Sequence, residues 1–533
     1  MNKNNSSKYL TDTKNLINFI SECPDCFHTA NAICKKLREN GYTELFETKD
    51  NNIRRGGKYF IVRNMSSVIA FRIPNSDPSG FMICAAHGDA PSFKLKPISE
   101  SQNGVYCTLN TEKYGGMIYS TWLDRPLSIS GRVVVSYNNG VKIKLFNTGR
   151  DFCLIPNLAI HMNSETNSGF KFNPQTDLQP ICGSVASNGR LIDEIADKLS
   201  VKPTDIIDYD LFLSNNERGV IWGADNEFFS APRIDDLQCA YAATTAFINS
   251  ADTTAVPVLA VFDNEEVGSS TKQGAGSTFL RDTLIRIVHS LNGSDIDYAR
   301  LTASSFMLSA DNGHAIHPNR PEKADPKNYP VLNGGVVIKY NANQRYTTDS
   351  ISAAIFKRIL DKNSIPHQVY TNRSDIPGAP FNGSMCTPTE MTLKKHGDRY
   401  YLAALPIKST ENLVVKSDKL DDFTLTHCTH ELGSKACRIS FTVKEGNLTC
   451  SLYGLEMKLD KNGLTCGESL LPRLKNEPMK VDIITDTNSV EIYLNDVANT
   501  VIAHVLDETK PTFTIHAEDP VEVQNLTVSE LSL

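Results

Sequence analysis

The chain has 533 residues, enough for three or four domains of ordinary size. With 40% hydrophobic and 22% charged residues, its composition excludes disorder, collagen and coiled coil as descriptions of the whole chain. The net charge of -7 provides no basic excess for binding a phosphate backbone, so nucleic acid is excluded as a main partner.

The first residues, MNKNNSSKYL, are polar and lack the apolar stretch of a secretory signal. No run in the sequence approaches the ~20 apolar residues of a membrane helix, so we expect no membrane partner. The 13 cysteines have no framework spacing, which is typical of reduced thiols. These features together predict a soluble, cytoplasmic, multidomain protein.

The first 97 residues predict mixed α/β structure. Apolar residues recur with helical spacing through residues 12–40, and the stretch ends at Gly41. Extended apolar runs follow at 58–63, 67–72 and 81–86.

A β-rich pattern replaces this one from residue 98 to residue 228. Short apolar runs are divided there by Gly, Asn and Pro, and Asn138-Asn139-Gly140 predicts a hairpin turn. Residues 229–375 return to helices that alternate with apolar strands, which favours a mostly parallel sheet. The simplest account is an α/β domain in two parts, 1–97 and 229–378, interrupted by a β-rich insertion at 98–228.

After about residue 380 the helical signal disappears. Alternating strands such as RISFTV and SVEIYLND, divided by turn signals, predict an antiparallel sandwich over 379–533. The predicted fold class is therefore an α/β core, a mixed sheet with flanking helices, together with a β-rich insertion and a C-terminal all-β sandwich.

Three apolar strands of the α/β core each end in a polar cluster. His87-Gly88-Asp89 follows the first, Asp263-Asn264-Glu265-Glu266 the second, and Asp311-Asn312-Gly313-His314 the third. Open α/β sheets bind ligands at the carboxyl ends of their strands, so we expect these clusters to converge in one crevice. Asp235, just before a predicted helix, is a fourth candidate.

A histidine with several carboxylates suits zinc, manganese or cobalt. Of the adjacent Glu265 and Glu266, one can bind metal while the other stays free as a general base. Each feature also has a structural interpretation. His87 can be a hydrogen-bonded loop residue, Asp235 or Asp236 a helix cap, and the two glutamates the first turn of a helix. The three clusters taken together favour a metal site.

Several ordered segments then point to a family. They include HGDAPSFKLKP (87–97), NEFFSAPRIDDL (226–237), FDNEEVGSSTKQGAGS (262–277) and SADNGHAIHPN (309–319). Through them, residues 12–376 resemble the aspartyl aminopeptidases, cytosolic dinuclear metallopeptidases. The resemblance implies removal of N-terminal Asp or Glu from peptides. It also implies that the insertion is a dimerisation domain and that the chain forms a homo-oligomer built from dimers, up to a dodecamer.

The resemblance also implies metal ligands. His87 and Asp311 would hold one Zn²⁺ and Glu266 a second, with Asp235 bridging the two; Mn²⁺ or Co²⁺ would also suit such ligands. Glu265 would be the general base.

It implies supporting roles as well. Asp89 would fix the tautomer of His87. His161, which could equally be an ordinary strand histidine, would reach a neighbouring subunit's active site from the insertion. Lys339 and Tyr346 would line the substrate pocket, where a lysine suits an acidic side chain.

The match breaks after NRSDIPG (372–378). The family's last zinc ligand is a histidine in a Met-His-Ser segment, and no Met-His pair occurs in this chain. The second ion would keep only Asp235 and Glu266, so we expect an enzyme impaired by the lost ligand and a core truncated at its C-terminal end.

The remainder resembles another family. Met385, Pro388 and Thr389 to Leu393 resemble the end of the catalytic domain of glycoside hydrolase family 32, and VDIITDTNSVEIYLND (481–496) resembles the signature of that family's C-terminal sandwich. That family's catalytic propeller is absent. The alternative function is a catalytically inactive fusion whose sandwich has a structural or glycan-binding role.

Overall fold

The structure, a computed structural model, describes residues 3–49, 51–167, 169–373, 389–396, 398–467, 469–474, 477–486, 489–496, 498–503 and 511–531. The chain divides into two compact units, residues 1–313 and 314–533. The predicted domain boundaries at 97, 228 and 378 stay predictions. Residue 378 and the motif residues Met385 and Pro388 lie outside the described residues.

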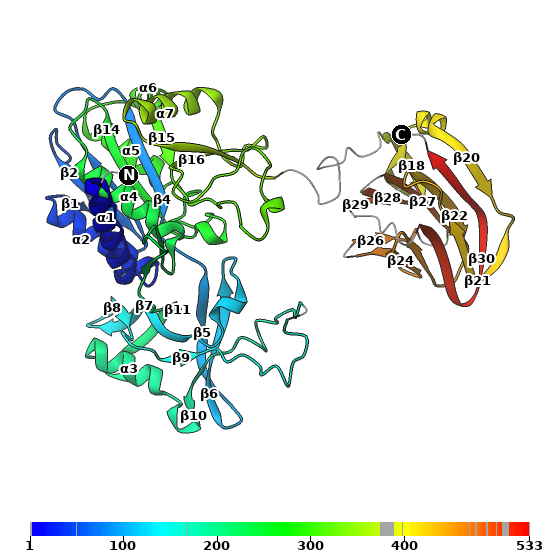
Figure 1. Cartoon of the computed structure of the whole chain (residues 1–533), viewed down its shortest axis with the longest axis horizontal. Helices are drawn as coiled ribbons and strands as arrows, with labels where there is room; N and C mark the ends of the chain where they lie inside the picture. The colour runs from blue at the N-terminus through cyan, green and yellow to red at the C-terminus, as the bar shows by residue number, and fades with distance from the viewer. Residues whose placement is uncertain are drawn as a thin grey trace. The chain divides into compact units, whose positions relative to one another are not determined.

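A six-stranded mixed sheet forms the centre of the first unit (Figure 1). Its strands in spatial order are β1 (Thr43–Leu45), β2 (Lys58–Arg63), β3 (Ser67–Arg72), β14 (Val256–Phe262), β4 (Phe81–His87) and β15 (Phe306–Ser309). β3 is antiparallel to both of its neighbours, whereas β14, β4 and β15 are parallel to one another. The structure confirms the predicted mixed sheet.

Helices cover both faces of this sheet because its strand residues are apolar on both sides. Val68 and Ala70 of β3 pack into one core, and Ile69 and Phe71 into the other, as the two-residue period of a strand requires. The first core contains residues of α1 (Lys3–Glu22), α2 (Cys26–Glu39) and α4 (Ile234–Asn249). The second contains buried residues of α5 (Phe279–Ser290), and half-buried Tyr298 and Leu301 of α6 (Asp295–Ala303) pack against it.

The predicted helical stretch 12–40 is two helices, separated at residues 23–25. Pro24 cannot donate a helical hydrogen bond and disfavours helical geometry in the residue before it. The Asp25 carboxylate then accepts the N–H groups of Phe27 and His28, at 2.9 and 3.0 Å, and so begins α2.

The insertion forms a lobe with its own core (Figure 1). Its seven-stranded sheet contains β5 (Ser92–Asn103), β6 (Tyr106–Tyr114), β7 (Pro126–Tyr137), β8 (Gly140–Asn147), β9 (Cys153–Leu154), β10 (Ile181–Ser184) and β11 (Ile206–Asn215). Because β11 pairs with both β5 and β7, the sheet closes on itself. α3 (Arg190–Leu199) packs against this core, and β12 (Val220–Trp222) pairs with β13 (Phe228–Ser230). The predicted hairpin turn joins β7 to β8.

The second unit begins with the parallel pair β16 (Val336–Tyr340) and β17 (His367–Thr371), connected through α7 (Ser350–Lys362). A hairpin of β18 (Thr389–His396) and β19 (Arg399–Pro406) follows.

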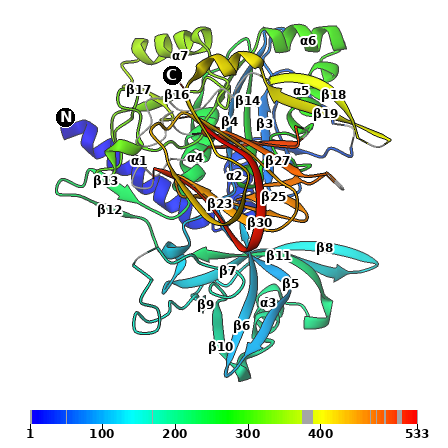
Figure 2. The ribbon, with the colours of Figure 1, turned by 90° about the vertical axis from the view of Figure 1, so that its right-hand side faces the viewer.

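The C-terminal region is an eleven-stranded antiparallel sheet around one apolar core. Its strands are β20 (Val414–Lys419), β21 (Phe423–Glu431), β22 (Cys437–Val443), β23 (Leu448–Leu452), β24 (Leu455–Asp460), β25 (Gly463–Cys466), β26 (Ser469–Pro472), β27 (Met479–Asp486), β28 (Ser489–Leu494), β29 (Ala498–Ala503) and β30 (Thr512–Leu531). The long, curved β30 pairs with β20, β21, β22 and β23 (Figure 2). The predicted β-rich C-terminal region is confirmed.

Within the described residues, no helix is both long enough and apolar enough to cross a membrane.

Candidate metal centre

Three parallel strands bring the predicted polar clusters to one edge of the mixed sheet. Phe262, the last residue of β14, lies opposite His87, the last residue of β4. The Gly88 N–H donates to the Phe262 carbonyl at 2.8 Å, and the Ala310 N–H, just after β15, donates to the Ala85 carbonyl at 2.7 Å. The loops that carry Asp89, Glu265 and Asp311 therefore begin side by side.

Four side chains form a group suited to a metal ion. His87, Asp235, Asp236 and Asp311 each offer one ligand atom, and these atoms all lie within 4.8 Å of one another. Nε2 of His87 is 3.4 Å from Oδ1 of Asp235 and 4.0 Å from Oε2 of Glu265. The structure thus brings together the three ligands predicted for the first ion, with the predicted general base beside them.

The imidazole of His87 is buried and held from its Nδ1 side. Nδ1 lies 3.1 Å from the main-chain carbonyl oxygen of Asp89 and 3.4 Å from its carboxylate Oδ1. An N–H at Nδ1 satisfies both oxygens, so a metal ion that replaces the Nε2 proton would meet a lone pair directed toward Asp235. This is the tautomer that a metal ligand needs.

Asp236 holds the start of α4 to the end of β4. Its fully buried carboxylate accepts the His87 N–H at 3.2 Å and the Asn312 side-chain amide at 3.1 Å. Burial raises the pKa of Asp236 to about 7. The peptide bond between Asp235 and Asp236 is cis.

The buried carboxylate of Asp89 accepts hydrogen bonds from two other segments of the site. It accepts the Tyr114 hydroxyl at 2.7 Å and the N–H groups of Glu265 and Glu266 at 3.2 and 3.3 Å. Tyr114 ends β6 of the insertion, and its hydroxyl also accepts the Asn264 amide at 2.8 Å. Burial raises the pKa of Tyr114, so the phenol stays protonated and donates to Asp89.

The carboxylates of the site carry negative charge that a bound cation would stabilise. Burial and the charge of Asp89 raise the pKa of Glu266 to about 7, and burial raises that of Glu265. Burial opposes the charged form of His87, but hydrogen bonds to Asp235 and Asp89 prevail and raise its pKa to about 11. A divalent cation would offset the same negative charge, and one imidazole with carboxylate oxygens is a donor set that zinc accepts. The residues present therefore fit one zinc ion.

Glu266, predicted to hold a second ion together with Asp235, lies outside the four-residue group. A Cβ on Gly115 would lie 3.0 Å from the Glu266 Cβ, so the left-handed glycine (φ +74°) allows the insertion to approach this glutamate closely.

The three residues predicted to bind substrate lie in two parts of the chain, the insertion and the second unit. His161 lies in an exposed turn of the insertion, not in a strand. The half-buried Lys339 of β16 has its ammonium nitrogen 5.5 Å from the ring centre of Tyr346. Both residues belong to the second unit, where they contact each other.

Sequence reasoning missed the residues that support the site: Tyr114, Asn264, Asn312 and the acceptor role of Asp236. Nothing in the sequence indicates that the Tyr114 hydroxyl reaches a carboxylate 25 positions earlier in the chain.

Comparison with known proteins identifies relatives over this part of the chain. The model of the family "Aminopeptidase I zinc metalloprotease (M18)" matches residues 19–389. A probable M18 family aminopeptidase 2 of Clostridium acetobutylicum is 46% identical over 380 residues, covering 69% of this chain and 88% of the relative. A probable aspartyl aminopeptidase of Ricinus communis is 33% identical, covering 68% of this chain and 84% of the relative.

Solved structures agree with these matches. The mApe1 dodecamer of S. cerevisiae is similar with a TM-score of 0.61 and 25% identity, covering 68% of this chain and 86% of that one.

We predict that Asp89→Asn lowers zinc affinity about 10–100-fold, the usual cost of losing a partner that orients a ligand. The amide would offer one oxygen where the carboxylate offers two, and its NH₂ would face the N–H of either Glu265 or Glu266, because these groups donate to different oxygens of Asp89. Titration calorimetry with zinc measures the effect, with the exposed Asp77→Asn as the matched control. Equal affinities for the two variants would contradict the role given to Asp89.

Proposed function

Because this chain belongs to the Aminopeptidase I zinc metalloprotease (M18) family, and is thus by descent a metal-dependent aminopeptidase, we propose that it releases acidic residues from the N-termini of peptides. The observation that carries the proposal is the convergence of His87, Asp235 and Asp311 with Glu265 beside them. This group supplies zinc ligands and a base at the same edge of the sheet.

In the proposed mechanism, Nε2 of His87 and the carboxylates of Asp235 and Asp311 would hold the ion. When bound there, zinc would supply a Lewis acid for the scissile carbonyl and for the attacking water. Glu265, whose side chain is 48% exposed, takes a proton at its carboxylate from the attacking water. The same carboxyl group then passes a proton to the leaving amine. Burial raises the pKa of Glu265 and so makes the carboxylate a better proton acceptor.

Asp89 fixes the geometry of both halves of this machinery. Its main-chain and side-chain oxygens orient His87, while its carboxylate accepts the N–H of Glu265 and so fixes the loop that carries the base. The position of this loop determines whether Glu265 lies within hydrogen-bond reach of the reacting water.

We predict that Glu265→Gln lowers the release of aspartate from an Asp-linked chromogenic substrate at least about 100-fold, because the amide cannot accept the proton. Zinc content should not change, since Glu265 is not among the proposed ligands. Glu217→Gln, another exposed glutamate of the same unit, is the matched control. Turnover equal in the two variants would refute the role of Glu265.

We propose further that turnover is impaired because the second ion lacks a ligand. The relatives match this chain over 84–88% of their own lengths, and the family match ends at residue 389, where the β-rich region begins. The histidine that completes the second site in the family is expected beyond this point, and the sequence has no Met-His pair. Asp235 and Glu266 alone give too few donors for tight zinc binding.

Zinc content tests this proposal. We predict that Asp311→Asn lowers the zinc content by about one ion per chain, whereas Glu266→Gln leaves it unchanged. Elemental analysis after dialysis against zinc-free buffer measures both. Loss of an ion in Glu266→Gln would show that another group completes the second site, and the impairment proposal would then be wrong.

The proposed acidic specificity rests on Lys339, since a lysine in the substrate pocket would pair with an Asp or Glu side chain. The named relative from Ricinus communis is a probable aspartyl aminopeptidase. We predict that Lys339→Met lowers kcat/KM for an N-terminal Asp substrate at least about tenfold while leaving that for a Leu substrate unchanged, an ion-pair loss of about 1.4 kcal/mol or more. An equal loss for both substrates would contradict the assignment.

We also propose that the chain forms a homo-oligomer through its insertion, with His161 reaching the active site of a neighbouring subunit. Exposure of His161 in one chain is compatible with this role.

We propose that the C-terminal sandwich, which lies beyond the family match, is a segment of glycoside hydrolase family 32 ancestry joined to the peptidase. The 12 cysteines within the described residues are free thiols, which supports a reducing cytoplasm as the location.

A further inference from the structure

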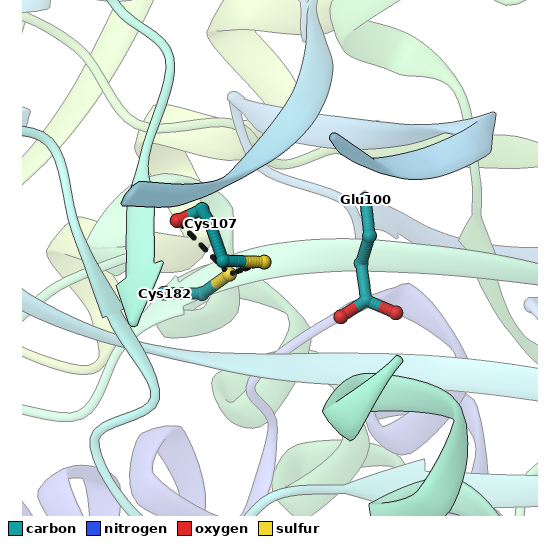
Figure 3. A group of neighbouring side chains, drawn as sticks. All are labelled: Glu100, Cys107 and Cys182. Atoms are coloured by element: carbon teal, nitrogen blue, oxygen red, sulfur yellow. Dashed lines mark hydrogen bonds between the residues drawn. The ribbon is translucent and has the colours of Figure 1, made fainter. Parts of the chain in front are cut away.

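The insertion contains a second group of potential metal ligands, none of which belongs to the active-site group. Glu100 of β5, Cys107 of β6 and Cys182 of β10 each offer one ligand atom, and these three atoms lie within 4.8 Å of one another. Figure 3 shows the two cysteines side by side, with the Cys107 thiol directed toward the side on which Glu100 lies. The active-site mechanism uses none of them.

A β-bulge brings the two thiols together. The pairing of β10 with β6 shifts register between Ile181 and Gly183, and Cys182 is the residue at this irregularity. Its Sγ lies 3.2 Å from Sγ and 3.4 Å from the carbonyl oxygen of Cys107. Two cysteines on regularly paired strands would be held at the spacing of the ladder, whereas the bulge redirects Cys182 onto its neighbour.

The carboxylate of Glu100 is fixed by the first turn of α3. Its Oε1 accepts the Gly189 N–H at 3.1 Å and the Leu191 N–H at 3.4 Å. These bonds hold the side chain in one orientation and leave lone pairs for another partner, as the outer contacts of metal-ligating carboxylates do.

We propose that Glu100, Cys107 and Cys182 bind a zinc ion that is separate from the active-site metal. Two thiolates and one carboxylate oxygen are a donor set that suits zinc and disfavours magnesium or calcium. Two sulfurs on one tetrahedral zinc at about 2.3 Å lie about 3.8 Å apart, so the pair has to open only slightly. Water can take the fourth position.

Binding requires no electron transfer. Each thiol loses its proton to solvent as its sulfur–zinc bond forms, and the two thiolates and the carboxylate then carry the charge that the cation neutralises. Burial raises the pKa of Cys182, so this thiol stays protonated near neutral pH until a cation lies beside it. The same burial disfavours the Cys182 thiolate that would begin disulfide formation with Cys107.

Cobalt titration of the full chain tests the proposal. The reduced protein is stripped of metal with a chelator and titrated with Co²⁺, because thiolate ligands give cobalt an intense near-ultraviolet charge-transfer band that imidazole and carboxylate ligands do not. We expect this band in the unmodified chain and its loss in Cys182→Ser. Glu100→Gln, which keeps an oxygen for the amides of α3, should weaken cobalt binding at least about tenfold.

Two controls separate this site from the active site. Asp311→Asn removes an active-site ligand, and Cys239→Ser removes the thiol that contacts Asp236. Both variants should retain the band. The proposal is overturned if the reduced chain shows no band, if Cys182→Ser keeps it, or if Cys239→Ser or Asp311→Asn loses it. Mass spectrometry of the reduced sample checks for a Cys107–Cys182 disulfide, whose persistence without cobalt uptake would also overturn it.

Discussion

The site depends on the parallel pairing of β4, β14 and β15. Hydrogen bonding fixes Phe262 opposite His87 and Ser309 opposite Ala85, so three chain segments far apart in sequence leave the sheet at the same edge. A shift of one residue in either pairing would turn the side chains of a strand to the opposite face and displace its loop. The buried apolar residues on both faces of the sheet hold this register, since a slip would have to move all of them together.

Asp89 adds a second constraint, because its carboxylate connects the catalytic loop to the insertion. It accepts the N–H groups of Glu265 and Glu266 and the hydroxyl of Tyr114, the last residue of β6. A buried charge without such donors would be costly, so these bonds stabilise Asp89 as an anion and fix the loops around it. The insertion is thus a support for the metal centre within one chain, besides the assembly role proposed for it.

The β-rich C-terminal region has a core of its own, with residues such as Phe441 and Phe513 fully buried. Because this sheet buries its own apolar residues, its stability does not require contacts with the other domain. The chain therefore combines the metal-ligand group of His87, Asp235, Asp236 and Asp311 with a β-rich region that lies beyond the family match.

The sequence by itself determined the strands β2, β3, β4 and β14, because unbroken apolar runs between polar turns leave few alternatives, and it determined which residue types follow them. It indicated His87, Asp235 and Asp311 as one group through strand ends and family segments. Tertiary structure alone decided the contacts of Tyr114, Asn312 and Asp236, and the meeting of Cys107 with Cys182 at a bulge. Side-chain hydrogen bonds across a fold depend on distances of a few tenths of an ångström, and hydrophobic periodicity carries no such information.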